Sequence, residues 1–218
     1  VAPMALLAAW MHGIRHTAPD LSEFFLGPLL IGGAMIFWLL FLHLVVCRDR
    51  LPSLGIGPGR RGADLAVGVA LGAGLLMLKH VSDPWLAGLF PRRPPTPEIV
   101  QLIRVVAADP WLLALWLGPV VWLGVAAFEE LWRVFVLHRL WSLFPGRAGA
   151  WSAVLVVSVL IGFAHGYQGP AGGVSIAAKS VLMGAYFMTA RRLVPLIVAH
   201  ALYDSVQIAM AVWALRGH

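Results

Sequence analysis

Residues 111–143 read WLLALWLGPVVWLGVAAFEELWRVFVLHRLWSL, a run long and apolar enough to cross a membrane. Past the middle of this run stand Glu129 and Glu130, followed by Arg133. An unpaired charge inside a membrane costs about 2.5–3.5 kcal/mol on insertion scales, so such residues are rare in spans and usually functional. The run therefore predicts both a membrane-spanning helix and a polar site within it.

The composition of the whole chain agrees with a membrane protein. Hydrophobic residues make up 60% of the sequence and charged residues only 12%, whereas about a quarter of the residues of a soluble domain are charged. A length of 218 residues accommodates about six spanning helices of ~20 residues with their connections. We expect one integral membrane domain over residues 1–218, with no separate soluble domain.

The apolar runs predict the fold class, an all-α, polytopic membrane helical bundle. One short amphipathic helix is expected at the membrane interface over residues 98–108, and loops are expected at 48–64 and 83–97, where Pro, Gly and Arg gather. Six spans are expected in the apolar runs at residues 25–46, 65–78, 111–143, 150–164, 174–190 and 193–215.

The net charge of +6 comes largely from arginines at the ends of the apolar runs. This placement favours contact with anionic lipid headgroups over nucleic-acid binding. The arginine-rich first, third and fifth connections are predicted to face the cytoplasm, in a protein of the bacterial inner membrane. They hold Arg48, Arg50, Arg60, Arg61, Arg139, Arg147, Arg191 and Arg192, against Arg92, Arg93 and Arg104 in the second connection.

Three more polar residues lie in the last apolar runs: His165, His200 and Asp204. A turn near Gly146 makes an antiparallel hairpin of the runs that carry Glu129 and His165, and both residues lie roughly 25–28 Å along their helices from it. His200 and Asp204 are four residues apart and share a helix face. Each residue alone fits an interhelical hydrogen bond, but a shared depth indicates a common site.

The order of these residues resembles three motifs of one family of membrane proteases. Glu129-Glu130-x-x-Arg133, then Ile161-x-x-x-His165, then His200-x-x-x-Asp204 are similar to motifs of the CAAX prenyl protease and bacteriocin-processing (CPBP, or Abi) family. The family's usual forms are Glu-Glu-x-x-x-Arg, Phe-x-x-x-His and His-x-x-x-Asn/Asp. The resemblance implies an intramembrane endopeptidase of the glutamic type, with its catalytic core in about residues 111–210.

The resemblance also implies roles for the site residues. Glu129 is expected to activate a water molecule, with His165 helping to hold that water, while His200 and Asp204 match the pair that stabilises the oxyanion. Because an ionised aspartate cannot donate a hydrogen bond, our hypothesis is that Asp204 orients His200 and that His200 alone donates. Glu130 and Arg133 are supporting residues. Arg133 stands one residue earlier than in the family, so the sequence leaves open which glutamate stays free.

Several alternatives remain open at this point. Two histidines and a glutamate can also bind zinc, which would make a zinc-dependent intramembrane peptidase. The helical His-Glu-x-x-His signature is absent, and the resemblance implies no cofactor. A catalytically silent membrane scaffold or immunity-type protein of the same fold is a further hypothesis, as is a haem-binding or ion-translocating protein. The expected partners are a hydrophobic or lipid-modified peptide substrate and membrane lipids, with no nucleic acid.

Overall fold

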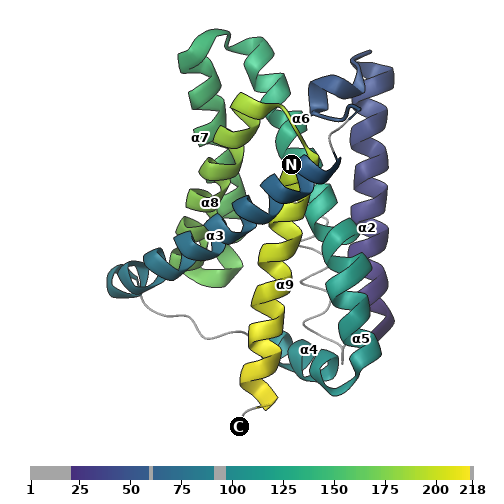
Figure 1. The fold of residues 1–218 in the computed structure, drawn as a ribbon, viewed down its shortest axis with the longest axis vertical. Helices are drawn as coiled ribbons and strands as arrows, with labels where there is room; N and C mark the ends of the chain where they lie inside the picture. The colour runs from purple at the N-terminus through teal and green to yellow at the C-terminus, as the bar shows by residue number, and fades with distance from the viewer. Residues whose placement is uncertain (1–20, 59–60, 91–96, 217–218) are drawn as a thin grey trace.

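The computed structural model of the chain describes residues 21–58, 61–90 and 97–216. Within these ranges the regular elements are helices (Figure 1). They are α2 (Leu21–Phe41), which continues as a wide turn (Leu42–Val46), a 3₁₀ turn (Leu51–Leu54), α3 (Arg61–Leu89), α4 (Pro97–Ala108), α5 (Pro110–Leu115), a π-helical segment (Trp116–Ala127), α6 (Phe128–Leu143), α7 (Gly146–Ala164), a 3₁₀ turn (Gly166–Gln168), α8 (Gly169–Ala190) and α9 (Val194–Arg216).

Six helical stretches in the described ranges are long and apolar enough to cross a membrane. They are Phe25–Val46, Arg61–Leu89, Pro110–Leu143, Gly146–Ala164, Gly166–Ala190 and Val194–Leu215. This confirms the predicted all-α, multi-pass bundle with six spans, and α4 matches the predicted short helix. Residues 1–20 lie outside the described ranges, and a single domain over 1–218 stays a prediction.

The second span is longer than the sequence predicted. A loop was expected from residue 83, but α3 continues to Leu89 with Pro84 inside it. Lys79 Nζ donates to Asp83 Oδ2 across one helical turn at 2.5 Å, which neutralises the two charges just before the proline. Helices inside membranes tolerate proline when neighbouring groups satisfy the freed carbonyl. Residues 83–89 of the expected loop are therefore helical.

The turns on either side of α7 match the sequence in kind and differ in position. α6 and α7 join through a turn at Pro145, as expected, but α7 already begins at Gly146 rather than at residue 150. After His165, a 3₁₀ turn leads to α8, which begins at Gly169 and not at residue 174. Gly169 has a φ of +83°, a conformation that glycine adopts without strain, and this permits the sharp change of direction.

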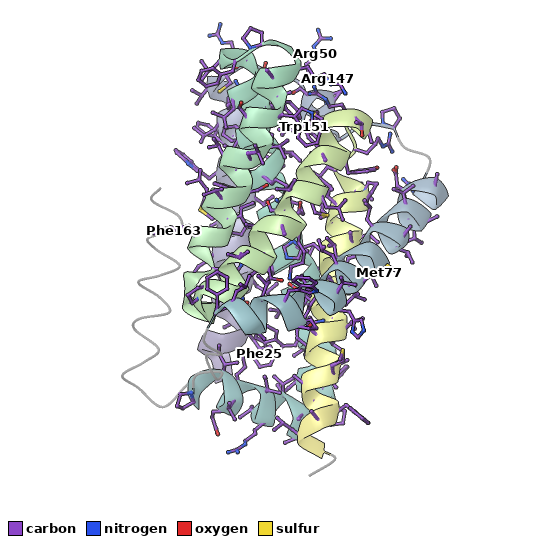
Figure 2. All side chains as sticks on the ribbon, turned by 90° about the vertical axis from the view of Figure 1, so that its left-hand side faces the viewer. Phe25, Arg50, Met77, Arg147, Trp151 and Phe163 are labelled. Carbon is purple, nitrogen blue, oxygen red and sulfur yellow. The ribbon has the colours of Figure 1, made fainter. Side chains whose placement is uncertain are left out.

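The arginine-rich connections gather at one end of the bundle. Figure 2 shows Arg50 and Arg147 at the same end, and Phe25 toward the other. Arg192, between α8 and α9, forms an ion pair there with Asp64 at the start of α3. The first, third and fifth connections thus share one end, as alternating spans require, while the membrane side they face stays a prediction.

Helix α6 lies inside the bundle and positions the two glutamates. Phe128, Leu131, Val134 and Leu137 are buried along one stripe of this helix, at the spacing that an α-helix places on one face. α6 packs against α2 and α7, while α3 runs obliquely across α8 and α9 (Figure 1). The π-helical segment before α6 is kinked at Gly118, where φ is −92° and ψ is −109°. Such segments often lie at functional sites.

Close packing of α3 on α9 predicts the effect of one substitution. A Cβ atom at Gly68 would lie 2.5 Å from Val198 Cβ, whereas one at Gly74, on the same helix, would meet nothing within 4 Å. We expect Gly68→Ala to lower the free energy of unfolding by roughly 1–3 kcal/mol through overpacking. Gly74→Ala should be neutral or slightly stabilising, because alanine favours a helix. Thermal unfolding of both variants in detergent checks this, and equal stability would contradict the observed helix contact.

Candidate functional site

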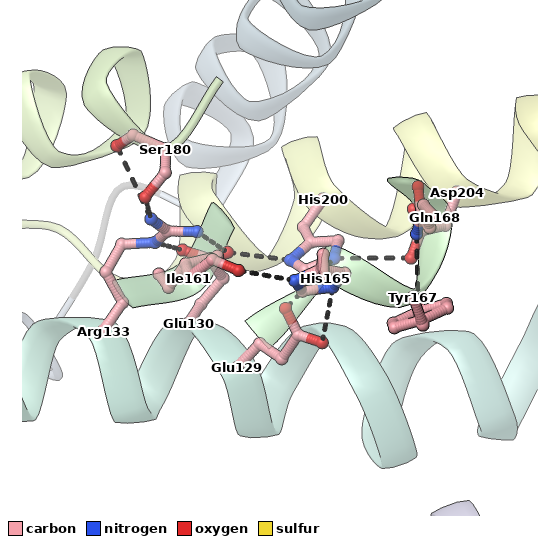
Figure 3. A network of polar contacts seen from close by, with 10 residues as sticks. All are labelled: Glu129, Glu130, Arg133, Ile161, His165, Tyr167, Gln168, Ser180, His200 and Asp204. Carbon is pink, nitrogen blue, oxygen red and sulfur yellow. Dashed lines mark hydrogen bonds and ion pairs between the residues drawn. The ribbon is translucent and has the colours of Figure 1, made fainter. Parts of the chain in front are cut away.

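The polar residues of α6, α7 and α9 meet inside the bundle. Figure 3 shows the carboxylate of Glu129 facing the imidazoles of His165 and His200. Glu129 lies in the first turn of α6, His165 follows the last residue of α7, and His200 lies in α9. Asp204 lies one turn further along α9, and its Oδ2 is 3.3 Å from His200 Nε2. The structure thus brings together the side chains that the sequence predicted to lie at a similar depth in the membrane.

Glu130 is engaged in a buried network and is shielded from solvent. Its side chain is fully buried, and Arg133 Nε and Nη2 donate to its two oxygens at 2.7 and 3.1 Å. Ser180 Oγ on α8 accepts a short hydrogen bond from Arg133 Nη1. His200 Nδ1 lies 2.8 Å from Glu130 Oε1. Glu130 is therefore a structural anion that holds the arginine and orients the imidazole.

Glu129 is the glutamate that stays free. Its side chain is 23% exposed, and no arginine contacts it in the described part of the chain. Oε1 lies 3.9 Å from His165 Nε2 and Oε2 lies 4.0 Å from His200 Nε2. Both distances exceed a direct hydrogen bond, so this carboxylate can accept a proton from water. The early position of Arg133 pairs it with Glu130 at i+3 and leaves Glu129 to face the histidines.

The backbone of α7 fixes the orientation of His165. Its Nδ1 lies 2.8 Å from the carbonyl oxygen of Ile161, one turn earlier. A carbonyl only accepts, so Nδ1 carries the hydrogen and Nε2 of the neutral ring is left as an acceptor toward Glu129. The contact uses the backbone of residue 161, so the isoleucine side chain takes no part in it.

His200 lies between carboxylates on both sides of its ring. Nδ1 faces Glu130, and Nε2 faces Asp204 and, at a greater distance, Glu129. When the ring carries two protons, both nitrogens are donors and each has an acceptor in place. This arrangement keeps an N–H on Nε2, the nitrogen nearest to Glu129, where it can stabilise a negative charge that develops during a reaction.

Several polar residues around this site were not predicted from the sequence. Ser180 holds Arg133, and Lys179, next to it on α8, donates to Tyr203 Oη of α9 at 2.5 Å. Tyr167 lies beside His165, with a ring separation of 5.8 Å. Lys179 carried a signal that was available, since it is a charged residue inside an apolar run. Serine and tyrosine are common in membrane helices and give no such signal.

Histidine and carboxylate side chains, the residue types of this site, are also common metal ligands. Within residues 21–58, 61–90 and 97–216, no three His, Cys, Asp or Glu side chains are grouped so as to hold a metal ion. The single cysteine, Cys47, is exposed in the first connection. Zinc binding by Glu129 and the two imidazoles that face it stays a hypothesis.

These features define a multi-pass integral membrane protein with an acid and two imidazoles clustered among its spanning helices. Residues 110–206 match the family model described as "Type II CAAX prenyl endopeptidase Rce1-like". Searches of curated proteins and of solved structures found no significant match. The family match confirms the resemblance to the CAAX prenyl protease family over the segment that carries all three motifs. This is a family of proteases, and the match supports a CAAX-type intramembrane protease at the level of the family.

Proposed function

We propose that this chain is an intramembrane endopeptidase that hydrolyses a peptide bond near the end of a hydrophobic or lipid-modified substrate. The observation that carries the proposal is the position of Glu129, which faces two imidazole Nε2 atoms at 3.9 and 4.0 Å while Arg133 neutralises Glu130. A general base needs an accessible carboxylate that no arginine neutralises, and Glu129 is such a group among the described residues. The family match supports protease chemistry at the same segment.

In the proposed reaction Glu129 takes a proton from water, and the water oxygen forms a bond to the scissile carbonyl carbon. His165 Nε2 accepts a hydrogen bond from the same water. The carbonyl oxygen becomes an oxyanion, to which His200 Nε2–H donates. When the carbon–nitrogen bond breaks, the leaving nitrogen takes the proton from Glu129. The carboxylate is then regenerated, and the two products are an acid and an amine.

The setting of the site suits an apolar substrate. Its residues lie within spanning helices or, for His165, at the end of one. A hydrophobic or lipid-modified peptide can therefore approach without leaving the bilayer. Membrane lipids are the other expected partner, and the arginine-rich end favours anionic headgroups. We propose the bacterial inner membrane as the location, on the asymmetry of arginines among the connections. No feature of this arrangement suggests a nucleic-acid partner.

Asp204→Asn tests the role assigned to the second histidine. Asparagine keeps a side-chain oxygen near His200 Nε2 but removes the charge, so we expect kcat/KM to fall roughly 10- to 100-fold without total loss. Kinetic assays of the purified variant check this, with the elution volume in detergent as the control for folding. Complete loss of activity in a well-folded variant would instead assign Asp204 a direct part in the reaction.

The direct test compares membrane proteomes of cells that express the wild type and cells that express Glu129→Gln. The proposal expects at least one membrane protein whose shortened form is present with the wild type and absent with the variant. Identical processing in both would support a catalytically silent scaffold.

Purified active protein should contain no stoichiometric zinc and should keep its activity with a chelator. Metal content together with chelator inhibition would show a zinc peptidase, and a Soret absorption band would show a haem protein.

A further inference from the structure

A buried lysine beside the site has no part in the mechanism described above. Lys179 lies midway along α8, and its residue is only 9% exposed. Its Nζ donates to Tyr203 Oη at 2.5 Å and lies 4.3 Å from the centre of the same ring. An ammonium group has three hydrogens to donate, and among the described residues only this phenol accepts one. A cation at such a depth is unusual and generally functional.

The charges around Lys179 are already paired with other groups. Those within electrostatic range are Lys79, Asp83 and Asp204. Asp83 binds Lys79 at 2.5 Å, and Asp204 lies 3.3 Å from His200 Nε2. Lys179 thus lacks a carboxylate of its own in the described part of the chain. Because a buried cation without a counterion is costly, this position is suited to an anion that arrives from outside the chain.

Lys179 is connected to the catalytic residues on two sides. Its neighbour Ser180 contacts Arg133 of α6, and its hydrogen-bond partner Tyr203 precedes Asp204 on α9. An extended peptide advances about 3.3–3.6 Å per residue, so a terminus two or three residues beyond the cleaved bond lies about 10 Å from it. Lys179 lies five residues further from the α8–α9 connection than His200. At ~1.5 Å rise per residue this is about 7.5 Å along the helices, a separation that such a short segment can span.

We propose that Lys179 and Tyr203 bind the carboxy-terminal carboxylate of the peptide substrate and so place the cleaved bond a short, fixed distance from the chain end. This inference rests on the proposed function and names what that site recognises. The ammonium and the phenol hydroxyl supply two donors that converge on one carboxylate, a charge-assisted arrangement. An anionic lipid headgroup carries similar chemistry, but the middle of a spanning helix lies far below the headgroup layer.

The experiment measures binding separately from cleavage. The probe is a fluorescent peptide that ends in an S-farnesyl cysteine followed by Val-Ile-Ala, made as the free acid and as the carboxamide. Anisotropy titrations use full-length Glu129→Gln protein in detergent micelles, which keeps the probe intact. We expect the acid to bind about 10- to 100-fold more tightly than the amide, as a hydrogen-bonded charge pair provides.

Variants in the same background assign this preference to the lysine. Adding Lys179→Met should bring the acid-to-amide ratio close to one. Adding Arg104→Met, which removes an exposed cation from α4, should change it by no more than about twofold. Tyr203→Phe keeps the cation and removes one donor, and it should lower the ratio by about three- to tenfold. It provides a second test if Lys179→Met does not elute as a single folded species.

Three results would overturn the inference. They are equal binding of acid and amide by the lysine-containing protein, an unchanged preference in a folded Lys179→Met variant, and displacement of the acid probe by phosphatidylglycerol, which would assign the position to a lipid headgroup. Cleavage by the wild type is measured independently. If the acid is preferred over the amide in a lysine-dependent way but nothing is cleaved, the proposed peptidase reaction is contradicted and the carboxylate site is supported. If the peptide is cleaved but acid and amide bind equally, the peptidase reaction is supported and the carboxylate site is contradicted.

Discussion

Glu129→Gln is expected to lower kcat/KM by about 10²- to 10⁴-fold, the usual contribution of a general base. Glutamine has nearly the same shape as glutamate but cannot take a proton from water. The carboxylate of Glu129 is 4.0 Å from His200 and 3.9 Å from His165, and no arginine in the described residues depends on it. The free energy of unfolding should therefore stay within about 1 kcal/mol of the wild type.

The matched control for this prediction is Asp109→Asn, another exchange of a carboxylate for an amide. Asp109 caps the start of α5, where its Oδ1 accepts a hydrogen bond from Trp111 N at 2.8 Å. Asparagine caps helices about as well as aspartate, so this variant should keep full activity. The measurement is the initial rate on a peptide that the wild type cleaves. Undiminished cleavage by folded Glu129→Gln protein would rule out this residue as the base.

The number of spans could be predicted because it depends on the length and average hydropathy of each apolar run, which the sequence contains directly. A helix rises about 1.5 Å per residue, which was enough to bring Glu129 and His165 to the same depth. The length of α3 was underestimated because Asp83 and Pro84 are typical of loops. In the structure Asp83 forms an ion pair with Lys79, and the helix continues past both residues. Whether a helix ends at residues such as Asp83 and Pro84 depends on their contacts, which the sequence pattern does not give.

The choice between the two glutamates could not be predicted, since it depends on which way their side chains point. Both can reach Arg133 on a helix, one at i+4 and the other at i+3. The structure selects Glu130 because Ser180 of α8 and His200 of α9 also contact the buried pair from neighbouring helices. These partners come from distant parts of the sequence, and a local spacing rule contains no information about them.

Glu130→Gln is expected to lower the free energy of unfolding by about 3–5 kcal/mol, the usual cost of removing one partner from a buried ion pair. The glutamate side chain is completely buried and that of Arg133 is 5% exposed, so water cannot replace the lost carboxylate. Activity should fall as well, because His200 loses the acceptor of its Nδ1. Reversible unfolding in mixed detergent micelles measures the stability change, alongside the kinetic assay.

Two further variants separate the buried charge from a general loss of contacts. Adding Arg133→Met to Glu130→Gln removes the uncompensated cation, and it should restore part of the lost stability. Asp49→Asn is the control at a half-exposed pair, since Arg139 and Asp49 have side chains that are 30% and 34% exposed. Water and salt screen a pair exposed to this degree, so it contributes little to stability. A Glu130→Gln variant as stable as Asp49→Asn would mean that Arg133 has another partner, and the division of the two glutamates into a structural anion and a catalytic base would then fail.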